Sequence, residues 1–399
     1  MRPDPLSYLS VEIDTLKQQG LYRRLRVLNG EQRATSQIDG RQVVNLSSNN
    51  YLGLTTHPRL RERALEATRR LGVGSGSVRP IAGTMDIHME LERRLADFKK
   101  TEAVVVFQSG FTANAGTVAS ILSSDDVVVS DELNHASIID GCRLSQATVK
   151  VFPHRDVDAA RAVLRSLPAS QRKLLVTDGV FSMDGDLGPL PALCDLAEEF
   201  GCIMMVDDAH ASGVFGANGR GTIDHFGVHG RVDVQVGTLS KAFGALGGYV
   251  AGSRSLVEFL QHRARPFLFS TSHPPAVAAS CLAALDVLME EPHIIERLWD
   301  NTHFFKAGLQ TLGFNTGSSE SPITPVIVGD AALAMTLSDR LFERGVFAQG
   351  IGFPTVARGR ARVRTIVTAT HTRDELSLAL NAFAQVGSEL GIISKPVQV

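Results

Sequence analysis

Cysteine is scarce in this 399-residue sequence: its four cysteines lie far apart, and no two of them form a Cys-x-x-Cys pair. This spacing argues against a zinc site or a disulfide framework and is typical of a reduced, cytoplasmic protein. The N-terminus has no apolar signal core, and no apolar run is long enough to cross a membrane. We therefore expect a cytoplasmic protein with no membrane partner.

An excess of basic residues is missing as well. The sequence has 40 Lys and Arg against 42 Asp and Glu, which gives a formal net charge of −2. Domains that bind nucleic acid usually carry a basic patch, so we expect no nucleic-acid partner. Two nucleotide-binding signatures are also absent: "GVGSGS" does not have the G-x-G-x-x-G spacing, and no G-x-x-x-x-G-K-[ST] occurs. A nicotinamide-dependent oxidoreductase remains the alternative from a different class, beside a non-catalytic binding module.

Short apolar runs alternate with helical patterns through the middle of the chain. The runs are "AVVVF", "DDVVVS", "KLLVT", "CIMMV" and "VDVQV". Such alternation predicts an α/β fold whose large, mostly parallel sheet is covered by helices on both faces. We divide the chain into an N-terminal segment (1–50), a large α/β domain (51–285) and a smaller C-terminal α+β domain (286–399). In the last of these, Thr372 and Glu375 have the spacing of a capping box, and Pro292 should end the preceding helix.

Polar residues follow each of these runs, at the strand ends where open α/β sheets bind ligands. One group suits a phosphate: a helix beginning at Ser109-Gly110-Phe111 offers free N–H groups, and Thr238 and Ser240 add hydroxyls. An ordinary capped helix is the alternative interpretation of that start.

Asp207 follows four consecutive apolar residues, so its carboxylate must lose solvation and needs a cation or strong donors. A protonated ring nitrogen would serve, and a helix cap or an arginine salt bridge are the alternatives. Asp207, Asp208 and His210 also resemble part of a metal site, but no second histidine has ligand spacing, so we predict no metal.

Lys241 lies among small uncharged residues in "GTLSKAFGALGG", where there is space for a flat ligand. Partial burial beside another cation would lower its pKa and make it a nucleophile that forms imines, whereas a solvated surface lysine is the ordinary case. His135 is suited to stacking on a ring, to acid–base chemistry or to a hydrogen bond in the core. Together, these groups predict a site for pyridoxal 5′-phosphate (PLP).

Five longer motifs then resemble one known family. "SNNYLGL", "DELNHASIIDGCRLS", "TDGVFSMDGDLGPL", "MMVDDAHASGVFGANGRG" and "GTLSKAFGALGG" are similar to those of the α-oxoamine synthases, a branch of the fold-type I PLP enzymes. The resemblance runs from about Leu21 to beyond His371, nearly the whole chain. It implies a PLP-dependent acyltransferase that works as a homodimer with shared active sites.

The resemblance also implies roles for single residues. Lys241 would be the imine lysine and catalytic base, and Asp207 would pair with the pyridine nitrogen. The other residues implied for the cofactor are His135 stacked on the ring, His210 and Ser182 near its phenolic oxygen, and Gly110, Phe111 and Thr238 around the phosphate. Thr271 and Ser272 would reach the cofactor of the neighbouring subunit. Arg364 would bind the amino-acid carboxylate, with Asn49 assisting.

The acyl group is predicted from a shorter segment. "SVRPIAGT" is similar to 2-amino-3-ketobutyrate CoA ligase, the glycine C-acetyltransferase, which predicts condensation of glycine with acetyl-CoA in threonine catabolism. The alternative is an 8-amino-7-oxononanoate synthase, which uses alanine and pimeloyl-CoA in biotin biosynthesis, or an enzyme that accepts both acyl groups. Tyr22 lies about where one kind of that synthase has an arginine for the pimeloyl carboxylate, and Arg23 and Arg24 are adjacent.

Overall fold

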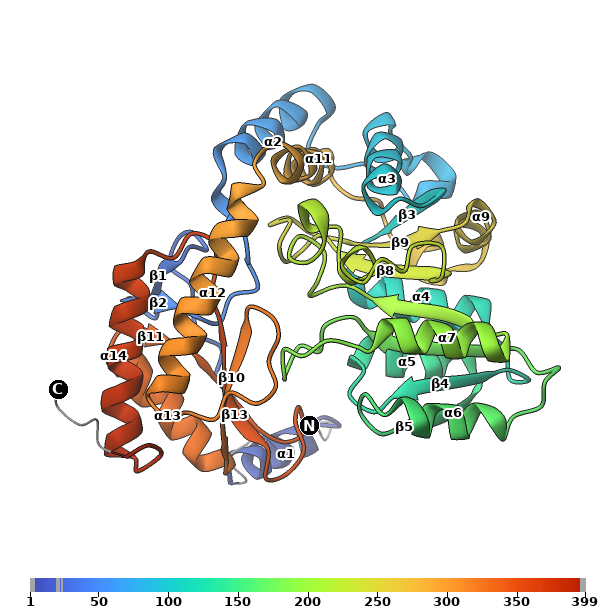
Figure 1. Ribbon diagram of the computed structural model, residues 1–399. Coiled ribbons are helices and arrows are strands. Elements are labelled where there is room, and N and C mark those ends of the chain that lie inside the picture. Colours follow the sequence, from blue (N-terminus) through green and yellow to red (C-terminus); the bar gives the residue numbers. More distant parts are fainter. Residues whose placement is uncertain (1–3, 19–21, 23, 395–399) are drawn as a thin grey trace.

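A seven-stranded sheet forms the centre of the computed structural model, which describes residues 4–18, 22 and 24–394 (Figure 1). The strand order is β3-β9-β8-β7-β6-β4-β5. The strands are β3 (Ala103–Phe107), β4 (Val127–Asp131), β5 (Thr148–Phe152), β6 (Lys173–Asp178), β7 (Ile203–Asp207), β8 (Val234–Thr238) and β9 (Gly248–Gly252). Only β9 runs antiparallel to its neighbours, so the carboxyl ends of the other six lie at one edge of the sheet.

Helices cover both faces of this sheet, which explains why its central strands are apolar on both sides. One face packs against α4 (Gly110–Ile121), α5 (Ala136–Ser145), α9 (Arg254–Arg263) and α10 (Arg265–Leu268). The other packs against α6 (Val157–Arg165), α7 (Leu190–Phe200) and α8 (Thr222–His225). Three more helices, α2 (Pro58–Leu71), α3 (Asp86–Lys99) and α11 (Pro275–Glu290), pack together beside β3 and β9.

Two strands of this sheet, β5 and β9, have no counterpart among the predicted apolar runs. β5 is an edge strand whose first four residues are exposed, so it lacks an apolar run. β9 is framed by glycines because it passes against the start of α4: a Cβ on Gly248 would lie 2.3 Å from the Ser109 carbonyl oxygen. Tertiary crowding, and not strand propensity, therefore sets the composition of β9.

Two smaller sheets bring the two ends of the chain together. β10 (Ile323–Gly329), β13 (Ala361–Ile366) and β12 (Gln349–Ile351) form an antiparallel sheet, while the hairpin β1 (Thr35–Ile38) and β2 (Arg41–Asn45) pairs with β11 (Val346–Phe347). Residues that we assigned to an N-terminal segment thus share a sheet with the C-terminal part. The division into three parts stays a prediction.

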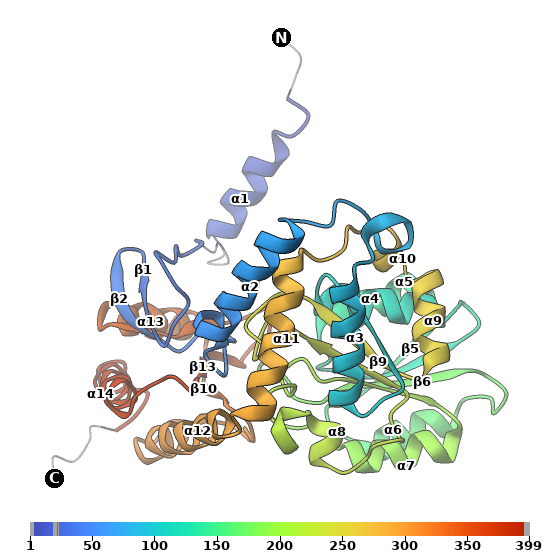
Figure 2. The same ribbon diagram turned by 90° about the horizontal axis from the view of Figure 1, so that it is seen from above.

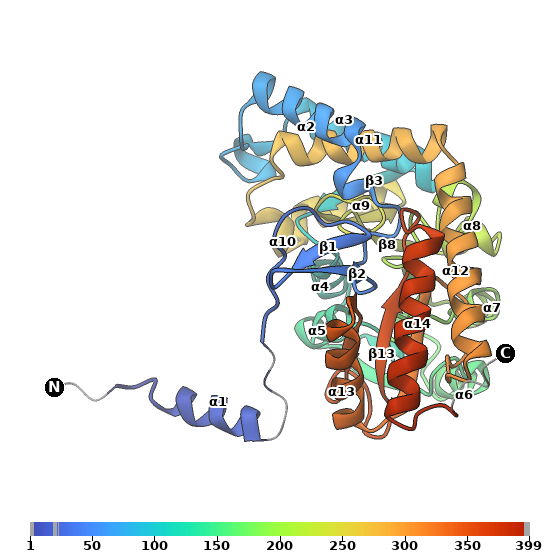
Figure 3. The same ribbon diagram turned by 90° about the vertical axis from the view of Figure 1, so that its left-hand side faces the viewer.

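The remaining helices surround these sheets. They are α12 (His293–Thr311), α13 (Ala331–Glu343) and α14 (Arg373–Glu389), with short helical turns at Leu54–Thr56, Arg79–Gly83 and Ala217–Gly219. The capping box is confirmed, since Thr372 and Glu375 exchange hydrogen bonds at the start of α14, and α11 ends at Glu290 just before Pro292. α1 (Tyr8–Gln18) buries none of its residues and extends away from the body of the chain (Figures 2 and 3). Within the described ranges, no helix is both long enough and apolar enough for a bilayer.

Candidate active site

A cavity of about 200 Å³ lies at the carboxyl ends of the parallel strands. Seven of the predicted site residues line it: Gly110, Phe111, His135, Asp207, His210, Thr238 and Lys241. They arrive from the ends of β3, β4, β7 and β8, which a parallel sheet places at one edge. The lining also includes Ser109, Asn114, Ser137, Asp178, Val180, Ala209 and Ser240.

The start of α4 forms one end of the cavity. Ser109 caps the helix, since its Oγ accepts from the Thr112 N–H at 3.1 Å and its carbonyl accepts from Ala113. No acceptor for the N–H groups of Gly110 and Phe111 is found in the described part of the chain, as expected for the first turn of a helix. A Cβ on Gly110 would meet Thr238 at an ordinary 3.5 Å, so no protein neighbour requires glycine here. These free N–H groups face an open cavity and could hold an anion, so the phosphate site stays a prediction.

Thr238 and Ser240 lie beside that cradle. Thr238 is buried and donates to the Gly247 carbonyl at 2.8 Å, and its Oγ1 lies 2.8 Å from the Ser240 hydroxyl. Thr238 is thus held by protein contacts, whereas Ser240 is exposed and its hydroxyl proton can rotate toward an added anion.

Lys241 supplies the amine of the cavity. Burial lowers its pKa to about 8, the nearby Asp207 and Asp178 carboxyls oppose that shift, and the Arg364 cation adds to it. Among the described residues, no hydrogen bond or ion pair engages the amine. A lysine amine with a pKa near 8 is a far better nucleophile at neutral pH than an ordinary lysine.

Asp207 ends β7 with a carboxylate that is 5% exposed. Its Oδ1 accepts from the Ala209 N–H at 2.9 Å, and its Oδ2 accepts from Asn114 Nδ2 at 2.6 Å. The neighbouring Asp208 is fully buried and pairs with Lys99 at 3.0 Å, so it is not available to the cavity. Within residues 4–18, 22 and 24–394 no cluster of His, Cys, Asp and Glu could hold a metal ion.

Asn114 and Ser137 were not predicted, although they connect two predicted residues. Asn114 Nδ2 also donates to Ser137 Oγ at 2.9 Å, and Ser137 Oγ lies 2.7 Å from Nδ1 of His135. A continuous chain of hydrogen bonds therefore joins His135 to Asp207. Helical spacing could have indicated Asn114, because it lies one turn after Gly110 and so on the same face of α4.

His210 lines the cavity and is bonded to a residue that the sequence did not single out. Its Nδ1 lies 2.7 Å from the hydroxyl of Tyr51, and both side chains are buried. Burial holds the pKa of His210 well below its usual value, and the Lys241 and Arg364 cations lower it further. The imidazole is therefore neutral at physiological pH.

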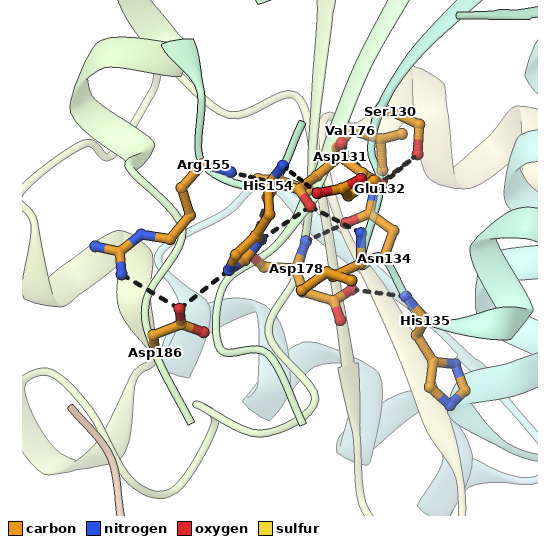
Figure 4. A network of polar contacts seen from close by, with 12 residues as sticks. Ser130, Asp131, Glu132, Asn134, His135, His154, Arg155, Val176, Asp178 and Asp186 are labelled. Atoms are coloured by element: carbon orange, nitrogen blue, oxygen red, sulfur yellow. Dashed lines mark hydrogen bonds and ion pairs between the residues drawn. The ribbon is translucent and has the colours of Figure 1, made fainter. Parts of the chain in front are cut away.

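Asp178 is a second buried carboxyl at the site. It ends β6 and pairs in register with Asp207 of β7. Burial and the Asp207 charge raise its pKa well above the usual range. Figure 4 shows how the loop before α5 holds it: Asn134 Oδ1 accepts from the Asp178 N–H at 2.8 Å, and Asn134 Nδ2 donates to Ser130 and to the Val176 carbonyl.

The same loop is fixed from outside by His154. Its two ring nitrogens each lie 3.0 Å from a carboxylate, that of Asp131 on one side and that of Asp186 on the other (Figure 4). Burial works against protonation of this imidazole, but the two carboxylates raise its pKa to about 9. His154 is thus a cation that connects the last residue of β4, Asp131, to Asp186 in the loop after β6.

Five residues of the predicted site lie outside the cavity wall: Asn49, Ser182, Thr271, Ser272 and Arg364. Arg364 on β13 donates through Nη1 to the Ser182 carbonyl at 3.0 Å, and Asn49 has a buried Oδ1 without a partner in the described part of the chain. The Thr271 carbonyl accepts from Gln108, and the buried Ser272 donates to the Gly83 carbonyl. Arg24 lines a separate cavity of about 390 Å³, and Arg23 lies outside the described residues.

A family model described as aminotransferase class I and II matches residues 41–383. The chain belongs to this family. It is 62% identical to an 8-amino-7-oxononanoate synthase of Symbiobacterium thermophilum, over 97% of this chain and 99% of the relative. It is 55% identical to 8-amino-7-oxononanoate synthase 1 of Bacillus subtilis, over 97% and 98% of the two chains.

The solved structures agree with this assignment. A serine palmitoyltransferase from S. paucimobilis, solved with bound PLP and myriocin, superposes on the chain with a TM-score of 0.93 at 32% identity, covering 98% of this chain and 100% of that one. The predicted fold-type I architecture and the resemblance to the α-oxoamine synthases are confirmed. The names of the relatives match the alternative acyl specificity, and glycine C-acetyltransferase gains no support from them.

Proposed function

We propose that this member of the family is an 8-amino-7-oxononanoate synthase that condenses alanine with pimeloyl-CoA and releases CoA. The observation that carries the proposal is the 62% identity to the Symbiobacterium enzyme over nearly the full length of both chains. The arginine of "SVRPIAGT", the segment that favoured acetyl transfer, has a structural role in this fold. Arg79 of "SVRPIAGT" is buried and pairs with Glu92 through both terminal nitrogens, at 2.8 and 2.9 Å, so it does not recognise an acyl group.

The donor set of the cavity suits PLP. The free N–H groups of Gly110 and Phe111 match a phosphate, Asp207 matches a protonated ring nitrogen, and Lys241 matches an aldehyde. The imidazole of His135 is an exposed wall against which a flat ring can stack. When bound, PLP supplies an electron sink for the bonds around the amino acid's Cα.

The protein residues then have two tasks, which are to stabilise charges on the ligands and to transfer a proton. The Asp207 carboxylate, held by Asn114 and Ala209, would pair with the ring nitrogen and favour its protonated form. The Lys241 amine, with its pKa near 8, exchanges protons near neutral pH and so acts as the base toward the substrate's Cα–H. We assign the carboxylate of the amino acid to Arg364, whose fork geometry suits a bidentate pair, with Asn49 beside it.

The homodimer forms part of this proposal. Phe111 lines the cavity and is 46% exposed, and Thr271 is exposed as well. A second copy that covers these residues would close the site and bring Thr271 and Ser272 toward the neighbouring cofactor.

The test is a comparison of four substrate pairs, alanine or glycine with pimeloyl-CoA or acetyl-CoA, measured as CoA release by the PLP-loaded protein. We expect kcat/KM to be highest for alanine with pimeloyl-CoA and to fall to background in Lys241→Ala. A preference for glycine with acetyl-CoA would overturn the proposed specificity. Full activity in Lys241→Ala would overturn the assignment of the base.

A further inference from the structure

Tyr51 is a buried residue that touches the site only through His210. It is 1% exposed, and its ring meets the imidazole edge-on, with centroids 6.1 Å apart and planes at 87°. Its backbone is anchored on both sides, since its N–H donates to the Asn49 carbonyl at 2.9 Å and its carbonyl accepts from Ala369 at 2.7 Å. Within the described chain, the Tyr51 hydroxyl makes one hydrogen bond, which is the 2.7 Å contact with Nδ1 of His210.

The direction of this hydrogen bond follows from the available donors and acceptors. A neutral imidazole carries one proton, so Nδ1 of His210 either donates to the Tyr51 oxygen or accepts from the Tyr51 hydroxyl. Burial lowers the pKa of His210 and raises that of Tyr51, so both groups are uncharged and the tyrosine keeps its proton.

If Nδ1 donated, the Tyr51 proton would need another acceptor. The nearby charged group is Arg364, which interacts electrostatically with Tyr51 and has only donors. A buried hydroxyl proton without an acceptor is costly. The hydroxyl therefore donates to Nδ1, and the imidazole proton is on Nε2.

We propose that Tyr51 is a positioning residue that fixes His210 in the tautomer protonated on Nε2, so that His210 offers a hydrogen-bond donor to the cavity. The expected acceptor is the phenolic oxygen of PLP, which the family resemblance places near His210, so this part of the proposal rests on the proposed function. A fixed donor needs no reorientation when the ligand binds, whereas an imidazole free to change tautomer would offer an acceptor part of the time. Tyr51 acts through His210 and needs no contact with substrate.

The tautomer is measured directly by nitrogen NMR on full-length protein with 15N-labelled histidine, with the His210 signals identified by their loss in His210→Gln. We expect a protonated Nε2 and an unprotonated, hydrogen-bonded Nδ1, both in the PLP-loaded protein and after PLP removal. In Tyr51→Phe we expect the Nδ1 signal to move to that of an unbonded nitrogen and the PLP dissociation constant to rise by about two- to tenfold.

The matched control is Tyr249→Phe. Tyr249 is equally buried, and its hydroxyl bonds to Ser212 at 2.8 Å and not to His210, so the His210 signals should not move. A proton on Nδ1 in the unchanged protein would overturn the proposal, as would His210 signals that are the same with and without the Tyr51 hydroxyl. A protein with the expected tautomer that fails to bind PLP would instead contradict the proposed function.

Discussion

Removing the amide of Asn114 should destabilise the protein more without PLP than with it. In Asn114→Ala, the Asp207 carboxylate loses the donor that lies 2.6 Å from its Oδ2 and keeps only the Ala209 N–H. The carboxylate cannot turn to water, because it is 5% exposed. Bound PLP offers a protonated ring nitrogen as a replacement donor, so its presence should offset part of the loss.

The size of the effect follows from the two hydrogen bonds of Asn114. A hydrogen bond to a charged group contributes about 1.5–3 kcal/mol, and the neutral bond to Ser137 contributes about 1 kcal/mol. We therefore expect the free energy of unfolding of the PLP-free protein to fall by about 2.5–4 kcal/mol. With saturating PLP the fall should be smaller, and by linkage the variant should gain more stability from PLP than the unchanged protein does.

Chemical denaturation of both forms, followed by far-UV circular dichroism, measures this difference. Ser137→Ala is the matched control, since it removes the other partner of Asn114 and leaves the donor to Asp207 in place. Because Ser137 bonds both Asn114 and Nδ1 of His135, its loss should be about 2 kcal/mol, and the loss should not depend on the Asp207 charge. An equal loss with and without PLP in Asn114→Ala would refute the reasoning, because the amide would then have no specific effect on the Asp207 charge.

Two further predictions concern buried charges near the site. Lys99→Met should cost about 3–5 kcal/mol in denaturation experiments, because it leaves Asp208 buried without its cation, and the double variant with Asp208→Asn should lose less. An additive loss in the double variant would contradict this. The raised pKa of His154, about 9, means that its ion pairs stabilise the fold fully below its usual pKa of 6.5 and lose that effect as pH rises through 9. The stability difference between the unchanged protein and His154→Gln should therefore shrink over that interval; a constant difference would show that protonation is not involved.

The sequence predicted the cavity-lining residues that follow strands, for a geometrical reason. Parallel strands place their carboxyl ends at one edge of the sheet, so residues such as Asp207 and Lys241 converge even though the chain separates them. Asn114, Ser137 and Tyr51 escaped this argument because they support the lining from helices and from a distant loop. Their contacts depend on tertiary packing, which no local pattern encodes.

The predicted acetyl specificity rested on the similarity of one short segment, "SVRPIAGT", and it gains no support from the relatives. In the structure, Arg79 of that segment is bonded to Glu92, thirteen residues later on α3. On β13, Arg362 likewise pairs with Asp184, at 2.6 Å. A sequence shows that an arginine is present, but its partner decides whether it binds a ligand or holds the fold.

The consecutive acids Asp207 and Asp208 show how packing gives similar residues different tasks. Asp208 is neutralised by Lys99, and burial raises the pKa of Asp178, so neither offers a free negative charge to the cavity. Among the described residues, Asp207 forms no ion pair and receives two neutral donors, although the Lys241 amine is near enough to interact with it electrostatically. Burial also lowers the pKa of Lys241 and so weakens its competition for that carboxylate. Under the proposed function, the cation for the Asp207 carboxylate would be a protonated ring nitrogen of the ligand.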